Sequence, residues 1–309
     1  MADDAQGDGT GEGTGGGTGG GTGDGGPLGP GGTSGTAVGG TVRPTRTTTP
    51  GPGPGVPVVV LLHAFPLDRS VWDDVVPLLA ARCRVVAVDL PGLGGSPVPA
   101  DEPDLDVAVR EVVTALDEED AVSSAVVVGL STGGYVAARM VALAPERVAG
   151  LGLLGTTTRV GPPDDPDERR ATASRVLGDE GLDAVMGSVD EGLSETARRE
   201  RPDLVGRVRT SIAAQRPEGV AWAARALAAR HATTDALVGF PGPVLLLFGE
   251  HDAATPPDVR GRELHEARPD ARLVVVPGSG HLTALEAPGA VAAAVLELVD
   301  AAGQGGAGA

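Results

Sequence analysis

The chain has 309 residues, a net charge of −18 and a single cysteine, Cys83. An acidic chain is a poor partner for nucleic acid, and one cysteine excludes an internal disulfide and favours a reducing, cytoplasmic location. All 24 basic residues are arginine, which excludes mechanisms that need a lysine, such as Schiff-base chemistry or a Walker-type phosphate loop.

Glycine dominates residues 1–54, and the first 55 residues hold 22 of the chain's 49 glycines. Such a stretch buries too little apolar surface to offset the entropy lost on ordering, so we predict a flexible tail. Its acidic start lacks the features of a secretory signal. The longest apolar runs of the chain fall far short of the ~20 residues that a membrane-spanning helix needs, and we expect no membrane partner.

Short β-branched apolar runs alternate with longer amphipathic segments from residue 55 onwards, which is typical of parallel strands joined by helices. We therefore expect an α/β core over residues 55–155 and 241–302. The predicted strands are Val56–Leu62, Arg84–Val88, Ala125–Gly129, Val148–Leu154, Val244–Phe248 and Arg272–Val276. The predicted core helices are Val71–Ala81, Leu105–Leu116, Ser131–Leu143, Pro257–Ala267 and Pro288–Ala302.

Residues 156–240 interrupt this alternation with short helical patterns separated by glycine and proline, and we interpret them as a helical cap over the sheet. Cap helices above a catalytic site line the pocket that selects the substrate. An arginine facing inward would suit an acyl group that carries a carboxylate. Trp222 is the candidate for lining this pocket, with anchoring of its helix as the other interpretation. The predicted cap helices are Asp165–Leu177, Leu182–Met186, Ser194–Glu200, Pro202–Gln215 and Pro217–Arg230.

The segment Gly129-Leu130-Ser131-Thr132-Gly133 lies between a predicted strand and a predicted helix, the setting that a nucleophile elbow requires. Small residues flank the serine because such a turn is strained and packs closely against neighbouring backbone. The elbow would present Ser131 at the start of the helix, where the N–H of Thr132 faces any oxyanion formed.

A serine hydroxyl needs a nearby base and a carboxylate that orients this base. His281 lies in a glycine-rich loop after one predicted strand, and Asp252 follows another. The second oxyanion donor is expected after the first parallel strand, at the N–H of Phe65. His63, two residues earlier, is expected to tie that loop to neighbouring backbone.

Five runs, HAFPLDRSVW, VVAVDLPGLGGS, VVVGLSTGGYVA, LLLFGEHD and PGSGHLTALEAP, together resemble the α/β-hydrolase superfamily. The order serine, acid, histidine along the chain is also the order of that superfamily. Within it, HAFPLD and the end of the cap look most like 3-oxoadipate enol-lactonase-like and carboxylesterase members. The superfamily fold is a mostly parallel central sheet flanked by helices, here with the helical cap inserted after the sixth strand. Only Thr36–Arg46 could supply the antiparallel strands that begin this fold.

The resemblance implies Ser131 as nucleophile, Asp252 as acid, His281 as base, and the N–H groups of Phe65 and Thr132 as the oxyanion hole. The implied reaction is hydrolysis of a small-molecule carboxylic ester or lactone through an acyl-enzyme, without metal or cofactor.

Two alternatives on the same fold stay open: a cofactor-free perhydrolase of the haloperoxidase type, and a non-enzymatic ligand receptor. A dehalogenase or epoxide hydrolase needs a carboxylate nucleophile at the elbow, and Ser131 argues against both.

Overall fold

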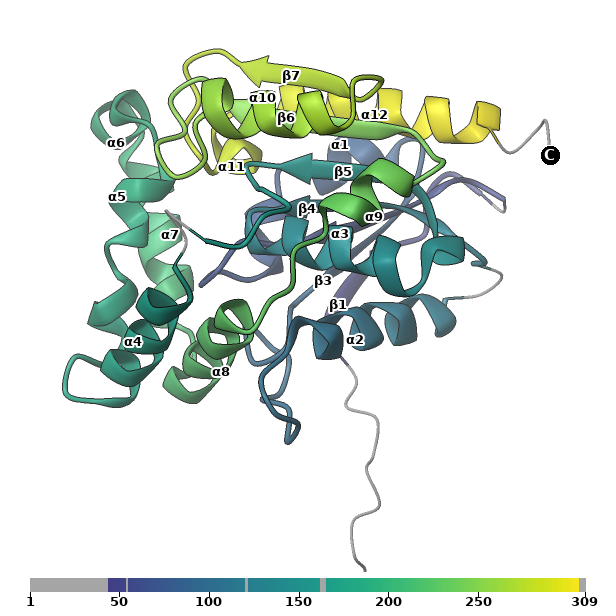
Figure 1. The fold of residues 1–309 in the computed structure, drawn as a ribbon. Helices are drawn as coiled ribbons and strands as arrows, with labels where there is room; N and C mark the ends of the chain where they lie inside the picture. Colours follow the sequence, from purple (N-terminus) through teal and green to yellow (C-terminus); the bar gives the residue numbers. More distant parts are fainter. Residues whose placement is uncertain (1–43, 54, 120–121, 162–164, 306–309) are drawn as a thin grey trace, which may run out of the picture. The chain divides into compact units, whose positions relative to one another are not determined.

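The computed structural model describes residues 44–53, 55–119, 122–161 and 165–305 of the chain, and the predicted tail over 1–43 lies outside them. The described strands form one seven-stranded sheet in the order β1-β3-β2-β4-β5-β6-β7 (Figure 1). β1 is antiparallel to β3, and every other neighbouring pair is parallel. The strands are β1 (Arg46–Thr49), β2 (Val58–Leu62), β3 (Arg84–Val88), β4 (Ala125–Leu130), β5 (Val148–Leu154), β6 (Val244–Gly249) and β7 (Arg272–Val276).

The central strands β2 and β4 explain why a parallel sheet forms. Every residue of both strands is buried, and their sequences VVVLL and AVVVGL are almost entirely aliphatic. A strand with apolar side chains on both faces is stable only where both faces are covered, as in an α/β fold. The six strands predicted from residue 56 onwards are all present, with bounds that differ by at most two residues.

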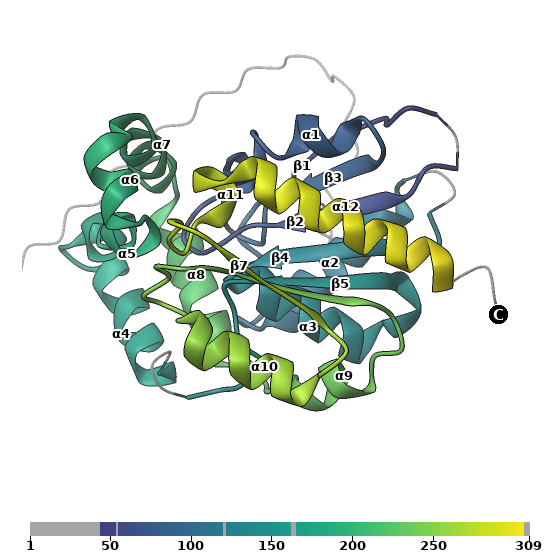
Figure 2. The same ribbon diagram turned by 90° about the horizontal axis from the view of Figure 1, so that it is seen from above.

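Helices cover both faces of this sheet (Figure 2). Helices α1 and α12 contact each other on one face, while α2 and α3 pack together on the other. No helix in the described part of the chain is long and apolar enough to cross a bilayer. The core helices are η1 (Arg69–Trp72), α1 (Val76–Ala80), α2 (Leu105–Asp117), α3 (Thr132–Leu143), η2 (Pro145–Arg147), α9 (Thr234–Gly239), η4 (Pro257–Gly261), α10 (Arg262–Ala267), α11 (Thr283–Glu286) and α12 (Pro288–Gly305).

The edge strand β1 corrects part of the predicted tail. Residues 46–49 were expected to be flexible, yet they pair with β3, with Arg46 opposite Val88 and Thr49 opposite Val85. Side chains fix this edge to the end of α2, because Arg46 contacts Glu118 at 2.7 Å and Glu119 at 3.2 Å. A polar edge strand has no apolar pattern of its own, since it takes its structure from its neighbour.

The inserted segment leaves the sheet after β5 and returns at β6. The sequence predicted that this insertion follows the sixth strand, which requires more than one strand before β2. Within the described residues only β1 precedes β2, so the insertion follows the fifth strand instead. The inserted helices gather at one end of the sheet, on the left of Figure 1. They are α4 (Pro166–Leu177), η3 (Gly181–Val185), α5 (Ser188–Gly192), α6 (Glu195–Glu200), α7 (Pro202–Ala213) and α8 (Pro217–Ala228).

Candidate active site

Ser131 occupies a strained turn between β4 and α3. Its φ is 53°, and among the described residues it is the only non-glycine with a positive φ. Its N–H donates to the carbonyl of Leu154 at 2.8 Å, which ties the turn to β5. A Cβ on Gly129 would overlap the backbone of Gly133, and a Cβ on Gly133 would overlap the carbonyl of Leu62. Only glycine fits at these two positions, so the sequence holds Ser131 in a sharp turn at the start of a helix.

His281 and Asp252 come from the loops after β7 and β6 and form a buried pair. Nδ1 of His281 donates to Oδ2 of Asp252 at 2.9 Å, because an ionised carboxylate only accepts hydrogen bonds. Burial raises the pKa of the Asp252 carboxyl, but the charge of His281 and hydrogen bonds from His281 and Thr255 outweigh burial and hold this pKa below its usual value. The carboxylate is therefore ionised at neutral pH and fixes the tautomer of the imidazole, leaving Nε2 to accept a proton.

Ser131 and His281 line the same cavity of about 110 Å³, together with Leu67, Tyr135 and Leu282. A second cavity, of about 430 Å³, lies between α4 and the η3–α5 region. Five residues line both cavities, so the two form an inner and an outer chamber. The shared residues are Phe65, Arg169, Ser188, Glu191 and Ala254.

Two backbone amides beside the inner chamber are candidates for an oxyanion hole. Among the described groups, the N–H of Phe65 and the N–H of Thr132 have no hydrogen-bond acceptor, whereas the N–H of Gly133 donates to the carbonyl of His63 at 3.1 Å. Amides left unused at a strand end and a helix start are suited to bind an anion.

His63 ties the loop after β2 to neighbouring backbone, as expected. Its Nε2 accepts the N–H of Leu90 at 2.9 Å, and its Nδ1 lies 3.0 Å from the carbonyl of Ala64. Burial lowers the pKa of His63, which keeps the ring neutral. The ring uses both nitrogens for structural hydrogen bonds and has none left for chemistry.

The structure separates Trp222 from the cavity. Its indole N–H donates to the carbonyl of Asp101 at 3.1 Å, and Trp222 is absent from the described lining of both chambers. The prediction that it lines the pocket is therefore wrong for these chambers, and the anchoring interpretation holds. An indole at the edge of a helix interface serves as an anchor because its apolar ring is buried while its N–H finds a partner.

A family comparison agrees with this fold. A family model described as "Alpha/beta hydrolase family" matches residues 59–294. The chain belongs to the alpha/beta hydrolase family. The expected fold class and the resemblance noted from the sequence are thereby confirmed.

Individual relatives within the alpha/beta hydrolase family are esterases and related proteins. A pimeloyl-(acyl-carrier protein) methyl ester esterase of Neisseria meningitidis is 30% identical over 252 residues, which cover 78% of this chain and 76% of that protein. The structure of a thermophilic esterase from Thermogutta terrifontis, described as malate bound, has a TM-score of 0.78 at 32% identity and covers 84% of this chain and 93% of its own. An enol-lactonase from Burkholderia xenovorans has a TM-score of 0.76 at 24% identity, covers 84% of this chain and 99% of its own, and shows the fold alone.

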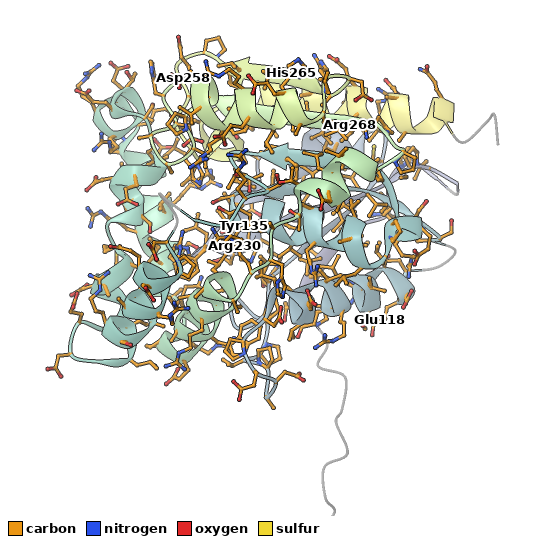
Figure 3. All side chains as sticks on the ribbon, in the orientation of Figure 1. Glu118, Tyr135, Arg230, Asp258, His265 and Arg268 are labelled. Carbon is orange, nitrogen blue, oxygen red and sulfur yellow. The ribbon has the colours of Figure 1, made fainter. Side chains whose placement is uncertain are left out.

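Several residues around this alpha/beta hydrolase site were not found from the sequence. Thr255 holds the Asp252 carboxylate with its N–H at 2.8 Å and its hydroxyl at 2.6 Å. A Cβ on Gly155 would come within 3.2 Å of both His281 and Asp252, so glycine leaves room for that pair. Tyr135 follows Ser131 by one helical turn, and the centroid of its ring lies 4.8 Å from the guanidinium carbon of Arg230; Figure 3 shows the two residues next to each other. A Thr three residues after an acid is the only one of these features that a turn motif could have indicated.

Proposed function

We propose that this hydrolase cleaves a carboxylic ester or lactone of a small molecule, with Ser131 as nucleophile, His281 as general base and acid, and Asp252 as the group that orients His281. The observation that carries the proposal is the buried 2.9 Å pair of His281 and Asp252 in the wall of the cavity that also exposes the strained Ser131. A nucleophile, a base and an orienting carboxylate at one cavity are the parts that acyl transfer needs.

In the first half of the reaction, the hydroxyl oxygen of Ser131 attacks the carbonyl carbon while Nε2 of His281 takes the hydroxyl proton. The N–H groups of Phe65 and Thr132 hold the oxygen that becomes negative, and the Asp252 carboxylate stabilises the imidazolium. Collapse of the tetrahedral intermediate breaks the ester bond, and His281 gives its proton to the leaving alcohol. The acyl group then remains as an ester of Ser131.

In the second half, a water molecule replaces the alcohol. His281 takes a proton from this water as it attacks the acyl-enzyme, and the same N–H groups hold the oxyanion again. When this intermediate collapses, the Ser131 oxygen leaves and takes the proton from His281, and the carboxylic acid is freed. Every proton moves through His281, so the cycle needs no metal, redox partner or cofactor.

The inserted helices give the substrate its polar surroundings. Arg169 on α4 lines both chambers, and its guanidinium lies 5.5 Å above the ring of Phe65, whose N–H is the proposed oxyanion donor. A fixed guanidinium beside the reacting carbonyl favours a substrate that carries an acidic group, because guanidinium binds carboxylates in a bidentate geometry. The inner chamber of about 110 Å³ limits the buried part of the substrate to a small group.

Replacing the nucleophile tests the proposal. We expect Ser131→Ala to abolish hydrolysis of p-nitrophenyl acetate and labelling by a fluorophosphonate probe, while the far-ultraviolet circular dichroism stays that of the parent protein. The exposed Ser174 on α4, changed to alanine, is the matched control and should leave both signals unchanged. Turnover that survives in Ser131→Ala contradicts the assignment. Labelling of the parent protein without turnover of any ester would instead favour a receptor.

A further inference from the structure

A single carboxylate joins the inserted segment to the loop that carries His281. Oε1 of Glu286 accepts the N–H of Gly280 and the N–H of Ser194, each at 3.0 Å, and Oε2 accepts the Ser194 hydroxyl at 2.6 Å. Gly280 directly precedes His281, and Ser194 is the N-cap of α6 in the insertion. Three donors on one carboxylate make a strong connection, because hydrogen bonds to a charged acceptor are short and stable.

Further hydrogen bonds to the backbone strengthen the same junction. The N–H of Leu282 donates to the carbonyl of Gly192 at 2.8 Å, and Nη1 of Arg201 donates to the carbonyl of Glu286 at 2.8 Å. A Cβ on Gly280 would lie 2.5 Å from the nitrogen of Ser194, so only glycine allows the approach. Leu282, after His281, is thus hydrogen-bonded to the insertion. Gly280, before His281, is hydrogen-bonded to the Glu286 carboxylate, which in turn binds the insertion.

Apolar packing also contributes to this junction, because Leu193 and Leu282 are buried and the Leu282 side chain packs against Gly192. A cavity of about 200 Å³ lies between α6 and the loop before His281, and its lining includes Thr196, Arg201, Ser279 and Glu286. The position of the loop therefore depends both on this packing and on the hydrogen bonds of Glu286.

We propose that Glu286 is a positioning residue that couples the insertion to the catalytic base. Glu286 binds Ser194, which lies two residues after Gly192 and three after Glu191. Gly192 lines the inner chamber, and Glu191 lines both chambers. A substrate that displaces α5 would therefore pull on Ser194, Glu286 and the backbone at Gly280, and so move the imidazole of His281. This inference rests on the proposed function, because it gives His281 the role of the base.

Glu286→Gln tests the coupling with little change in shape. The amide offers one accepting oxygen in place of two and carries no charge, so the contact to the Ser194 hydroxyl is lost or reversed. We expect kcat for p-nitrophenyl acetate to fall about tenfold to a hundredfold, with KM within about twofold, because a misplaced base slows chemistry more than binding. The chain has five histidines, so NMR can follow the ring signals of His281 separately, and we expect their chemical shifts to change in the variant.

Ser194→Ala keeps the carboxylate and removes only one of its three donors, which gives a second test if Glu286→Gln does not fold. We expect a smaller loss of kcat, and the double variant Ser194→Ala with Glu286→Gln should be no slower than Glu286→Gln alone, because both changes break one connection. Two controls are available. Asp104→Ala removes an N-cap far from the site, and Glu200→Gln changes an exposed carboxylate of α6. Both should keep the parent kcat.

The outcomes separate this inference from the proposed function. Parent values of kcat and of the His281 ring chemical shifts in both Glu286→Gln and Ser194→Ala overturn the coupling, as does a double variant whose loss is the sum of the two single losses. Activity that survives in Ser131→Ala overturns the proposed function instead. The ring chemical shifts of His281 then still show whether Glu286 positions the ring, since they do not depend on turnover.

Discussion

The sheet and the inserted helices contribute different kinds of residue to the cavity. Ser131, Asp252 and His281 each follow a strand, and each is held by backbone that the sheet fixes. Several of the residues that the insertion adds, such as Arg169 and Glu191, are charged and lie on helices of the cap. The difference indicates that the proposed chemistry belongs to the rigid sheet, whereas the choice of substrate belongs to the insertion.

The two sides of the insertion are also attached differently. On the α7–α8 side, Asp68 accepts the Ser211 hydroxyl at 2.8 Å and the Gln215 amide at 3.2 Å, and the side-chain carbonyl of Gln215 accepts the N–H of Gly94 at 2.8 Å. The α4–α5 side instead surrounds the two chambers. The α4–α5 side is joined to the core as well, at the loop of His281 through Gly192 and Ser194.

The largest effect is expected in the sheet. Asp252→Asn leaves the shape of the side chain but removes the charge that selects the His281 tautomer, so we expect kcat to fall by about 10⁴ for every ester tested. Equal losses for a small ester and a large one would support the division between chemistry and substrate choice. The exposed Asp258, changed to asparagine, is the control, measured in the same steady-state assay. A loss confined to one class of ester would contradict the division.

A buried carboxylate on α2 should affect the stability of the fold without affecting substrate binding. Both oxygens of Glu111 are buried and have no hydrogen-bond partner among the described groups, and burial raises its pKa to about 7. Because the folded-state pKa exceeds the ordinary value of 4.5, its contribution to stability is complete below pH 4.5 and is lost as pH rises through 7.

We therefore expect Glu111→Gln to unfold at higher urea concentration than the parent at pH 8, by about 2 kcal/mol in the free energy of unfolding, and to match it at pH 4 to 5. The exposed Glu102, changed to glutamine, should show no such pH dependence. A changed KM in Glu111→Gln would contradict the separation of stability from substrate binding, because α2 is not part of the described lining of either chamber.

A substitution on α8 should push the α7–α8 side of the insertion away from the sheet. A Cβ on Gly219 would overlap the carbonyl oxygen of Gly92, so Gly219→Ala forces α8 off the loop after β3. We expect a loss of about 1–3 kcal/mol in thermal unfolding together with a raised KM. A Cβ on Gly206 of α7 would meet no atom within 4 Å, so Gly206→Ala should instead stabilise the helix by about 0.5–1 kcal/mol. An unchanged KM in Gly219→Ala would show that α8 does not shape the chambers.

The smallest effect should be selective. Arg169→Gln is expected to raise KM about tenfold for an ester that bears a carboxylate, because the charged partner is lost, and to leave KM for a neutral ester of the same size unchanged. The next residue, Arg170, is exposed and pairs with Asp167, so Arg170→Gln serves as the control. Equal changes for both esters would assign Arg169 to packing against Phe65 and not to recognition.

The sequence predicted those parts of the fold and site that depend on local pattern. Continuous aliphatic runs predicted β2 to β7, and the glycines around Ser131 predicted its turn, because both depend on residues close in the chain. Thr255, Arg169 and Glu286 were not found, since their roles depend on partners brought together by the fold. Trp222 could be read either way until its hydrogen bond to Asp101 was known. The short helices α5 and α9 lack the length for a clear period.

The four-residue strand β1 has a consequence for solubility. Without it, β3 would end the sheet with its backbone N–H and C=O groups open along Val85 to Val88, a run of aliphatic residues that are otherwise buried. An open aliphatic edge is a template for pairing with another chain and so for aggregation. The Thr-rich sequence of β1, with Arg46 bound to Glu118 and Glu119, places a polar and charged border there instead. This polar border therefore disfavours pairing with a second chain at that edge.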